Sequence, residues 1–235
     1  MNEILDNNNA VTAASTRAFF RSVYSYMFGA LGISGIIAYS AGTPEFVNTY
    51  FISGNSISPL FWVVAFAPVG LGLLIQMAYN KLSLGFLTFL FIAYSALMGL
   101  SLSTIFLVYE MGAIASTFFV TAGAFAGMAI LGYTTKTDLT KFGSLLYMVF
   151  IGIFIAGIVN MFVGSENFSF IIACLGVFVF TGLTAYSMQQ LKGVAQSSDY
   201  TEEQRNKLAL IGGLQLYILF INLFLSLLRI FGGRD

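Results

Sequence analysis

Long runs of apolar residues alternate with short polar segments along almost the whole chain. The runs cover about residues 23–41, 60–78, a stretch within 82–109, 113–132, 142–163, 168–191 and 208–228. A helix needs roughly 20 apolar residues to cross the hydrocarbon core of a bilayer, so each run is long enough to span it. The pattern predicts seven transmembrane helices. The third run is longer than a crossing requires, which predicts a tilted helix.

Strands explain these runs less well than helices do. Strands of a membrane barrel alternate apolar and polar residues over about ten positions, and residues 142–163 show no such alternation. Inside a bilayer the backbone must satisfy its own hydrogen bonds, which an uninterrupted apolar segment does as a helix. The expected fold class is therefore an all-α membrane protein.

Composition supports the same class. The chain is 58% hydrophobic and 9% charged, whereas soluble domains average roughly 45–50% and about 25%. The formal net charge is zero, so no basic surface is expected to bind nucleic acid. The bilayer is the first partner that the sequence predicts.

The charged residues sort by loop. Bases occur in the N-terminal segment and in alternate loops, namely Arg17, Arg21, Lys81, Lys136, Lys141, Lys192, Arg205 and Lys207. The loops around Glu45, Glu110 and Glu166 hold no base. Basic residues stay on the cytoplasmic side, which predicts a cytoplasmic N-terminal tail (1–22) ahead of a transmembrane domain (23–235). Seven crossings place the C-terminus outside. Arg229 and Arg234 lie on the unexpected side of this rule and leave a re-entrant or short last helix as the alternative.

Small residues occur at helical spacing in several runs. They include Gly29, Gly32 and Gly35, then Gly123 and Gly127, then Gly152 and Ala156. Small residues let membrane helices approach closely, so we expect these positions to pack inside one bundle, with a dimer face as the alternative. Pro68 is expected to kink the second helix.

The residues needed for intramembrane catalysis are missing. A serine nucleophile needs a His or Lys base, and an aspartyl protease needs two acids. The chain has no His, and the predicted spans contain no Lys, Asp or Glu. Cys174 is the sole cysteine and forms no internal disulfide. We therefore expect no enzymatic activity, no metal site and no cofactor.

Neutral polar residues gather on the sixth and seventh predicted helices. The candidate set is Tyr186, Gln189, Gln215, Tyr217 and Asn222. One interpretation is hydrogen bonding between helices, worth roughly 0.6 kcal/mol for each bond. The other interpretation is a polar path for an ion or for water. The sequence leaves both open.

Four segments together resemble the bacterial members of the Bax inhibitor family, the transmembrane Bax-inhibitor-motif proteins. They are Met98–Ser103, Gly132–Leu139, Thr181–Tyr186 and Phe220–Phe224, the last followed by Leu227–Gly232. The resemblance implies two layers of three helices around a central, C-terminal seventh helix. It also implies a pH-sensitive calcium leak, which accompanies suppression of cell death in eukaryotic relatives. Bacterial relatives are thought to act in ion homeostasis or in regulating membrane proteolysis.

Two positions depart from the family pattern. The resemblance implies an Asp after Tyr186 and another before Phe220, and this pair is the proposed pH sensor. Here Ser187 and Leu219 stand at those positions. Two close carboxylates in a low dielectric share a proton, but a serine does not titrate in that range and a leucine does not titrate at all. The sequence therefore predicts a family member without the acidic pair.

These observations lead to one expected function and one alternative. The first is an ion leak in the bacterial inner membrane, acting in ion homeostasis without a proton-operated gate, with calcium or another cation as the permeant. A tight calcium site is not expected, because calcium prefers six to eight oxygen ligands that include carboxylates. The alternative is a non-conducting regulator that binds a membrane protease or another membrane protein.

Overall fold

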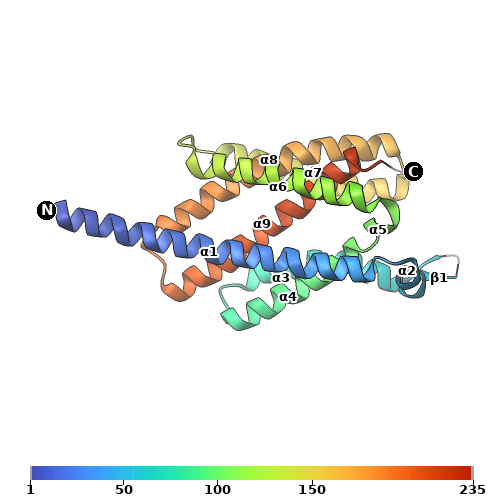
Figure 1. Ribbon diagram of the computed structural model, residues 1–235, viewed down its shortest axis with the longest axis horizontal. Coiled ribbons are helices and arrows are strands. Elements are labelled where there is room, and N and C mark those ends of the chain that lie inside the picture. Colours follow the sequence, from blue (N-terminus) through green and yellow to red (C-terminus); the bar gives the residue numbers. More distant parts are fainter. Residues whose placement is uncertain (1, 55, 234–235) are drawn as a thin grey trace. The chain divides into compact units, whose positions relative to one another are not determined.

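The computed structural model describes the backbone of residues 2–54 and 56–233, and the side chains from residue 13 onward within those ranges. Nearly all of it is helical (Figure 1). The elements are α1 (Asn2–Ala41), α2 (Pro44–Tyr50), β1 (Ile52–Ser53), β2 (Ser56–Ile57), α3 (Pro59–Ala78), α4 (Leu84–Leu102), α5 (Ile105–Val108), α6 (Met111–Thr134), α7 (Thr140–Val163), α8 (Glu166–Gln196) and α9 (Glu202–Phe231).

Seven segments within these described residues are long and apolar enough to cross a membrane. They are Ala13–Ala41, Pro59–Ala78, Leu84–Val108, Met111–Thr134, Thr140–Val163, Glu166–Gln196 and Glu202–Phe231. The predicted all-α fold with seven spans is confirmed. The seventh span is the most buried, since 67% of its apolar core lies inside the protein, against 50% for the sixth. Such burial is what a central C-terminal helix requires.

The first span begins earlier than the apolar run indicated. A helical stripe of buried residues runs along α1 from Thr16 through Phe19 and Phe20 to Val23 and Met27. The spacing of three or four residues puts these side chains on one face. Residues 13–22 therefore pack as part of the long helix, whereas the sequence analysis assigned them to a tail. Their polar neighbours lower the mean hydropathy and conceal the stripe. Met1 lies outside the described residues.

The third span is broken and not simply tilted. α4 ends at Leu102, and α5 begins only at Ile105. At the break, the Ser103 amide and hydroxyl both donate to the Leu100 carbonyl oxygen, at 3.2 and 2.7 Å. Serine and threonine hydroxyls compete with the helical ladder in this way. The consecutive Ser103 and Thr104 thus end the helix inside an apolar run.

The segment between the first two spans folds into a small cap of α2, β1 and β2. Thr43 begins α2 by accepting a hydrogen bond from the Phe46 amide at 3.2 Å. Ile52 pairs with Ile57 in a two-residue antiparallel ladder. Phe51 and Val47 pack with Val64 of α3. The apolar runs and the charge pattern predicted an outer loop here, but they predicted none of its internal structure.

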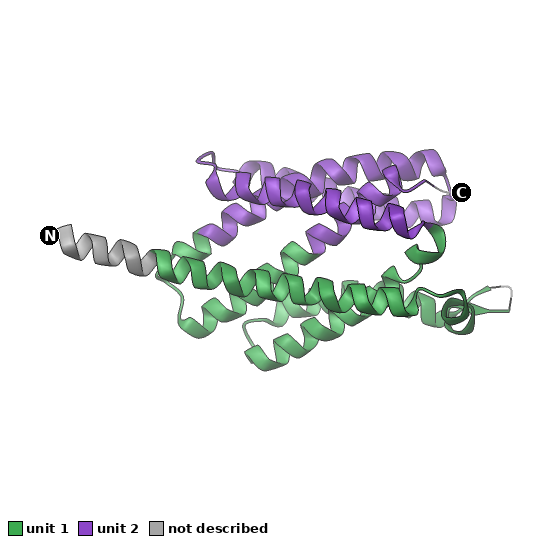
Figure 2. Ribbon diagram, in the orientation of Figure 1, with its two compact units in different colours: residues 1–108, 193–217 green, residues 109–192, 218–235 purple. Residues whose placement is uncertain are grey.

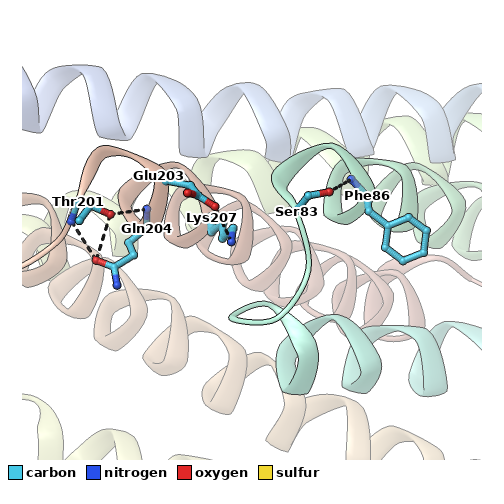
Figure 3. A network of polar contacts seen from close by, with 6 residues as sticks. All are labelled: Ser83, Phe86, Thr201, Glu203, Gln204 and Lys207. Carbon is cyan, nitrogen blue, oxygen red and sulfur yellow. Dashed lines mark hydrogen bonds and ion pairs between the residues drawn. The ribbon is translucent and has the colours of Figure 1, made fainter.

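The charged start of α9 explains why that helix is longer than its apolar run. Thr201 and Gln204 form a reciprocal cap, because the Gln204 amide donates to Thr201 Oγ1 at 3.3 Å and the Thr201 amide donates to Gln204 Oε1 at 3.0 Å (Figure 3). One turn later, Lys207 pairs with Glu203 at 2.9 Å, and ion pairs between residues four apart stabilise helices.

The start of α4 is capped by Ser83. Its hydroxyl oxygen accepts a hydrogen bond from the Phe86 amide (Figure 3).

The chain forms two compact units (Figure 2). Unit 1 contains residues 1–108 and 193–217, and unit 2 contains residues 109–192 and 218–235. In unit 1, α4 packs against α1 and against α3. The helix α9 contributes its first half to unit 1 and its second half to unit 2.

The small residues singled out in the sequence are not where helices approach most closely. A Cβ built on Gly29, Gly123, Gly127 or Gly152 would meet no described atom within 4 Å. The close approaches occur elsewhere, for example at Gly99, where a Cβ would lie 2.7 Å from the carbonyl oxygen of Ser34. The expectation that these positions pack inside the bundle is therefore wrong, because spacing identifies a small face but not its direction.

Candidate functional site

The two positions that depart from the family pattern are both buried. Ser187 on α8 is 0% exposed, and Leu219 on α9 is 5% exposed. Both belong to unit 2. Among the described residues, the buried side chains with polar atoms include serines, threonines, Tyr94 and Tyr217, and no Asp, Glu, Lys or Arg is buried. A carboxylate at either position would enter an interior that otherwise holds neutral groups.

Small residues on α6 and α7 bring the backbones of these helices close to α8. Gly132 of α6 contacts the Ala185 backbone, and a Cβ there would overlap the carbonyl oxygen. Gly143 of α7 lies against the ring of Tyr186. Tyr186 also meets Tyr147 edge to face, with ring centroids 6.1 Å apart. Tyr186, predicted to line a polar path, is thus half-buried and packs against α7.

Gln189 binds the linker between α6 and α7. Its Nε2 donates to the Thr137 carbonyl oxygen at 2.7 Å, and its Oε1 accepts from the Leu139 amide at 2.8 Å. Both hydrogen-bonding ends of one amide side chain are therefore engaged by main-chain groups. The structure assigns Gln189 to holding this linker, which no sequence signal had indicated.

Lys192, one turn further along α8, binds the end of α6. Its Nζ donates to the Tyr133 carbonyl oxygen at 2.8 Å and lies 5.0 Å from the centroid of the Tyr133 ring. A cation suits this place, because the last carbonyl groups of a helix carry partial negative charge and an aromatic face attracts cations. We call Gln189 and Lys192, with the segment Tyr133–Leu139 that they hold, the linker clamp.

Asp138 of the linker clamp lies two residues before the start of α7 at Thr140. Its Oδ1 accepts a hydrogen bond from the Thr140 amide at 2.9 Å. The pKa of the Asp138 carboxyl is held below its usual value, first by hydrogen bonds from the Thr140 side chain and backbone and then by the charge of Lys141. The carboxylate therefore stays ionised at the N-terminal end of α7, where a negative charge is favourable.

The two candidate residues of α9 in unit 1 lie in different surroundings. Gln215 is half-buried. Tyr217 is fully buried against Phe91 and Tyr94 of α4, with ring centroids 6.3 and 5.9 Å away. Phe91 and Tyr94 did not figure in the sequence analysis, although their spacing of three residues places them on one helix face.

Asn222, the candidate residue of α9 in unit 2, is satisfied within its own helix. Its Nδ2 donates to the Ile218 carbonyl oxygen at 2.8 Å, and Ser226 Oγ donates to the Asn222 carbonyl oxygen at the same distance. The half-buried Asn222 side chain therefore donates its hydrogen bond to a carbonyl group of its own helix. Of the five candidate residues, three belong to unit 2 and two to unit 1.

The three acids of the base-free loops lie at the surface. Glu45, Glu110 and Glu166 are exposed, and Glu166 sits in the first turn of α8. Among the described residues no group of three His, Cys, Asp or Glu side chains is arranged to hold a metal ion.

Comparison with known proteins agrees with the architecture. Residues 16–235 match the family described as "Inhibitor of apoptosis-promoting Bax1". The chain is 44% identical over 229 residues to "Inner membrane protein YbhL" of Escherichia coli strain K12, which covers 94% of each chain. An "Uncharacterized protein" of Borreliella burgdorferi is 44% identical over 216 residues, 92% of each chain.

A more distant relative extends the same match. An "Uncharacterized membrane protein" of Streptococcus pyogenes serotype M1 is 32% identical over 217 residues, 92% of this chain and 93% of the relative. The similarity thus runs through all seven candidate spans and is not confined to a few motifs. Matched over nearly its whole length and built from seven apolar helices, the chain belongs to the Bax inhibitor family of multi-pass membrane proteins.

Proposed function

We propose that this protein is a cation leak of the bacterial inner membrane that acts in ion homeostasis without a proton-operated gate. The observation that carries the proposal is the identity of two buried residues in a family member: Ser187 and Leu219 occupy the positions where the resemblance implies an acidic pair. Calcium or another cation is the expected permeant, and the proposal includes no catalytic step, metal or cofactor.

Burial explains why the loss of the acids would matter. A carboxyl group in a low-dielectric interior titrates near neutral pH and changes its charge there, which biases a bundle between two states. An acid at the centre of a membrane helix costs at least about 2.5–3.5 kcal/mol to insert. With Ser187 and Leu219 at these positions, the protein avoids that insertion cost. It also has no carboxyl group there that could change its charge with pH. Conduction in this protein should therefore be constant where an acidic pair would switch.

A flux measurement tests the proposal. The purified protein is reconstituted into liposomes that contain a calcium-sensitive dye, and calcium entry is followed from pH 6 to pH 8. We expect entry above that of empty vesicles, with less than about a twofold change across this range, because the chain has no His and the described residues include no buried acid. Replacing calcium by potassium or sodium identifies the permeant. Flux equal to empty vesicles for every cation at every pH would reject a leak.

A second candidate function is a non-conducting regulator that binds a membrane protease or another membrane protein. It is favoured by the linker clamp, because both ends of the Gln189 side-chain amide bind main-chain groups and offer little to a passing ion. Cross-linking in native membranes followed by co-purification distinguishes the two functions. A regulator is recovered with a stoichiometric partner, whereas a leak conducts alone.

The proposed orientation places the N-terminus and the linker clamp in the cytoplasm. Lys136, Lys141 and Lys192 lie in or beside the clamp, and basic residues are retained on the cytoplasmic side. Fusion of a fluorescent protein and of alkaline phosphatase to the C-terminus tests this. An outside C-terminus gives phosphatase activity and no fluorescence, and the reverse result would contradict the proposed orientation.

A further inference from the structure

A buried hydroxyl in unit 1 has no well-formed hydrogen bond to any residue that the structure describes. Tyr217 of α9 is 0% exposed, and its hydroxyl oxygen forms no hydrogen bond of ordinary length and angle with any described residue, although the Ser34 hydroxyl lies close enough to interact with it. The residue lies within the seventh membrane-spanning segment. A buried polar group without a hydrogen bond carries the full cost of its desolvation. Such a group is rare enough in folded proteins to need an explanation.

The surroundings of Tyr217 are not purely apolar. Tyr94 of α4 is 3% exposed, and its ring meets that of Tyr217 edge to face at 5.9 Å. Ser34 of α1 is 1% exposed and is a polar neighbour of the Tyr217 phenol. The Ser34 hydroxyl donates to the Ala30 carbonyl oxygen at 2.8 Å, so its oxygen retains lone pairs that can accept a further hydrogen bond.

A fourth helix, α3, packs against this cluster. A Cβ on Gly72 of α3 would lie 3.2 Å from Cε2 of Tyr94, so the absence of a side chain there makes room for the Tyr94 ring. Phe91 flanks Tyr217 on α4, with ring centroids 6.3 Å apart. Polar side chains from α1 and α4 thus lie beside Tyr217 of α9, and α3 packs against the Tyr94 ring, all within unit 1.

We propose that unit 1 holds an internal water site formed by the hydroxyl groups of Tyr217, Tyr94 and Ser34. A buried water typically makes about three hydrogen bonds to groups that are otherwise unsatisfied. Water both donates and accepts, so it can satisfy two phenol groups and a serine oxygen at once. The site would join α1, α4 and α9 by hydrogen bonds that no direct contact supplies.

The chemistry of the three groups selects water over a cation. All three are neutral, and no acidic residue is buried among the described residues of the protein. A cation taken from water into such a place would lose its hydration without a compensating charge. An apolar molecule would leave the Tyr217 hydroxyl unsatisfied. The inference does not depend on whether the protein conducts ions, since a regulator with the same fold would contain the same site.

Hydroxyl-radical labelling tests the site directly. X-ray radiolysis of the intact protein in lipid nanodiscs generates radicals from bound water, and mass spectrometry then measures the modification of each residue. After correction for intrinsic reactivity, we expect Tyr217 and Tyr94 to be modified several-fold faster than Phe125 and Phe180, which are also buried and pack on other aromatic rings. Equal rates for all four residues would overturn the proposal.

Replacement of the hydroxyl gives a second, signed measurement. If the Tyr217 hydroxyl binds water, Tyr217→Phe leaves that water a partner short, and the thermal midpoint should fall by about 2–4 °C. If the hydroxyl is dry, the same substitution removes an unsatisfied group and the midpoint should rise. Tyr39→Phe is the matched control, because Tyr39 is 65% exposed and also packs edge to face on a phenylalanine.

The two measurements also separate water from a bound ion. Tyr217→Phe should slow the labelling of Tyr94 several-fold, and Tyr39→Phe should leave it unchanged. The thermal midpoint of the wild-type protein should not respond to millimolar calcium or potassium. A midpoint that rises with either cation, and loses that response in Tyr217→Phe, would show a cation site and contradict the assignment to water.

Discussion

Gly132 of α6 lies so close to Ala185 of α8 that a side-chain carbon at position 132 would overlap the Ala185 carbonyl oxygen. The contact is made between two backbones, which cannot yield as a flexible side chain does. It therefore sets the distance between α6 and α8 directly before the linker clamp, whose first residue is Tyr133. Ser187, the first of the two substituted acidic positions, follows Ala185 by two residues.

The first prediction concerns this contact. Gly132→Ala should separate α6 from α8 and destabilise the protein by about 1–3 kcal/mol, because overpacking shifts backbones. The thermal midpoint in detergent would fall by several degrees. Gly127→Ala is the control on the same helix, where a Cβ meets nothing within 4 Å, and it should be neutral or slightly stabilising because alanine favours a helix. Equal effects of the two substitutions would contradict the close contact.

The second prediction concerns Gln189. Gln189→Leu keeps most of the side-chain volume but removes the acceptor of the Leu139 amide and the donor to the Thr137 carbonyl oxygen. Each hydrogen bond contributes about 0.5–1.5 kcal/mol, so hydrogen exchange of the Leu139 amide should accelerate roughly tenfold. Gln190→Leu, at the exposed neighbouring position, is the control. If exchange at Leu139 is unaltered by the loss of Gln189, the clamp is not closed in solution.

The third prediction is a pH dependence at Asp138. The pKa of its carboxyl is lowered in the folded protein, so the ionised form stabilises the fold. This contribution is present above the unfolded pKa of about 3.9 and is lost as the pH falls through the lower folded value. The midpoint of the wild-type protein should thus exceed that of Asp138→Asn at pH 6, with the difference shrinking below about pH 4.

A variant of the hydrogen-bond donor checks the cause of this pH dependence. The Thr140 side chain contributes most to lowering the pKa of Asp138, ahead of its backbone amide and of Lys141. Thr140→Val retains the shape and the amide but removes the hydroxyl. The pH-dependent change of the midpoint should then be smaller than in the wild-type protein and should be complete at a higher pH. An unchanged titration would assign the effect to another carboxyl group.

The fourth prediction restores the acidic pair. Ser187→Asp combined with Leu219→Asp places two carboxyl groups at buried positions of unit 2. Burial raises the pKa of an acid, and two coupled acids titrate in separate steps. Ion flux through the double variant should therefore vary between about pH 5 and pH 8, while flux through the wild-type protein stays level. The single variants are the controls. A wild-type protein that already switches strongly in this range would require a sensor elsewhere.

Much of the fold followed from local patterns. Seven apolar runs predicted seven spans, because a membrane helix must be apolar for its whole length whatever it contacts. The same reasoning missed the start of α1, where only one stripe through Thr16, Phe19 and Phe20 is buried. It also missed the break at Ser103, since hydropathy does not register a hydroxyl that bonds back to Leu100.

The candidate site was less predictable, because a polar residue in a membrane helix has several possible partners. Gln189 and Tyr217 looked alike in the sequence as neutral polar residues of late helices. In the structure Gln189 holds a linker through Thr137, and Tyr217 is enclosed without a well-formed hydrogen bond to its hydroxyl. Their difference depends on segments at least 50 residues away for Gln189, and on α1 and α4 for Tyr217.

The sequence alone determined the class of the protein, its seven spans and the absence of acids at positions 187 and 219, since each depends on which residues are present and on their spacing along one helix. Only the tertiary structure decided which glycines admit a neighbouring helix, as at Gly132 and not at Gly127. It likewise decided which polar side chains find a partner. The physical reason is direction: the helical repeat places a residue on a face, but packing chooses what that face meets.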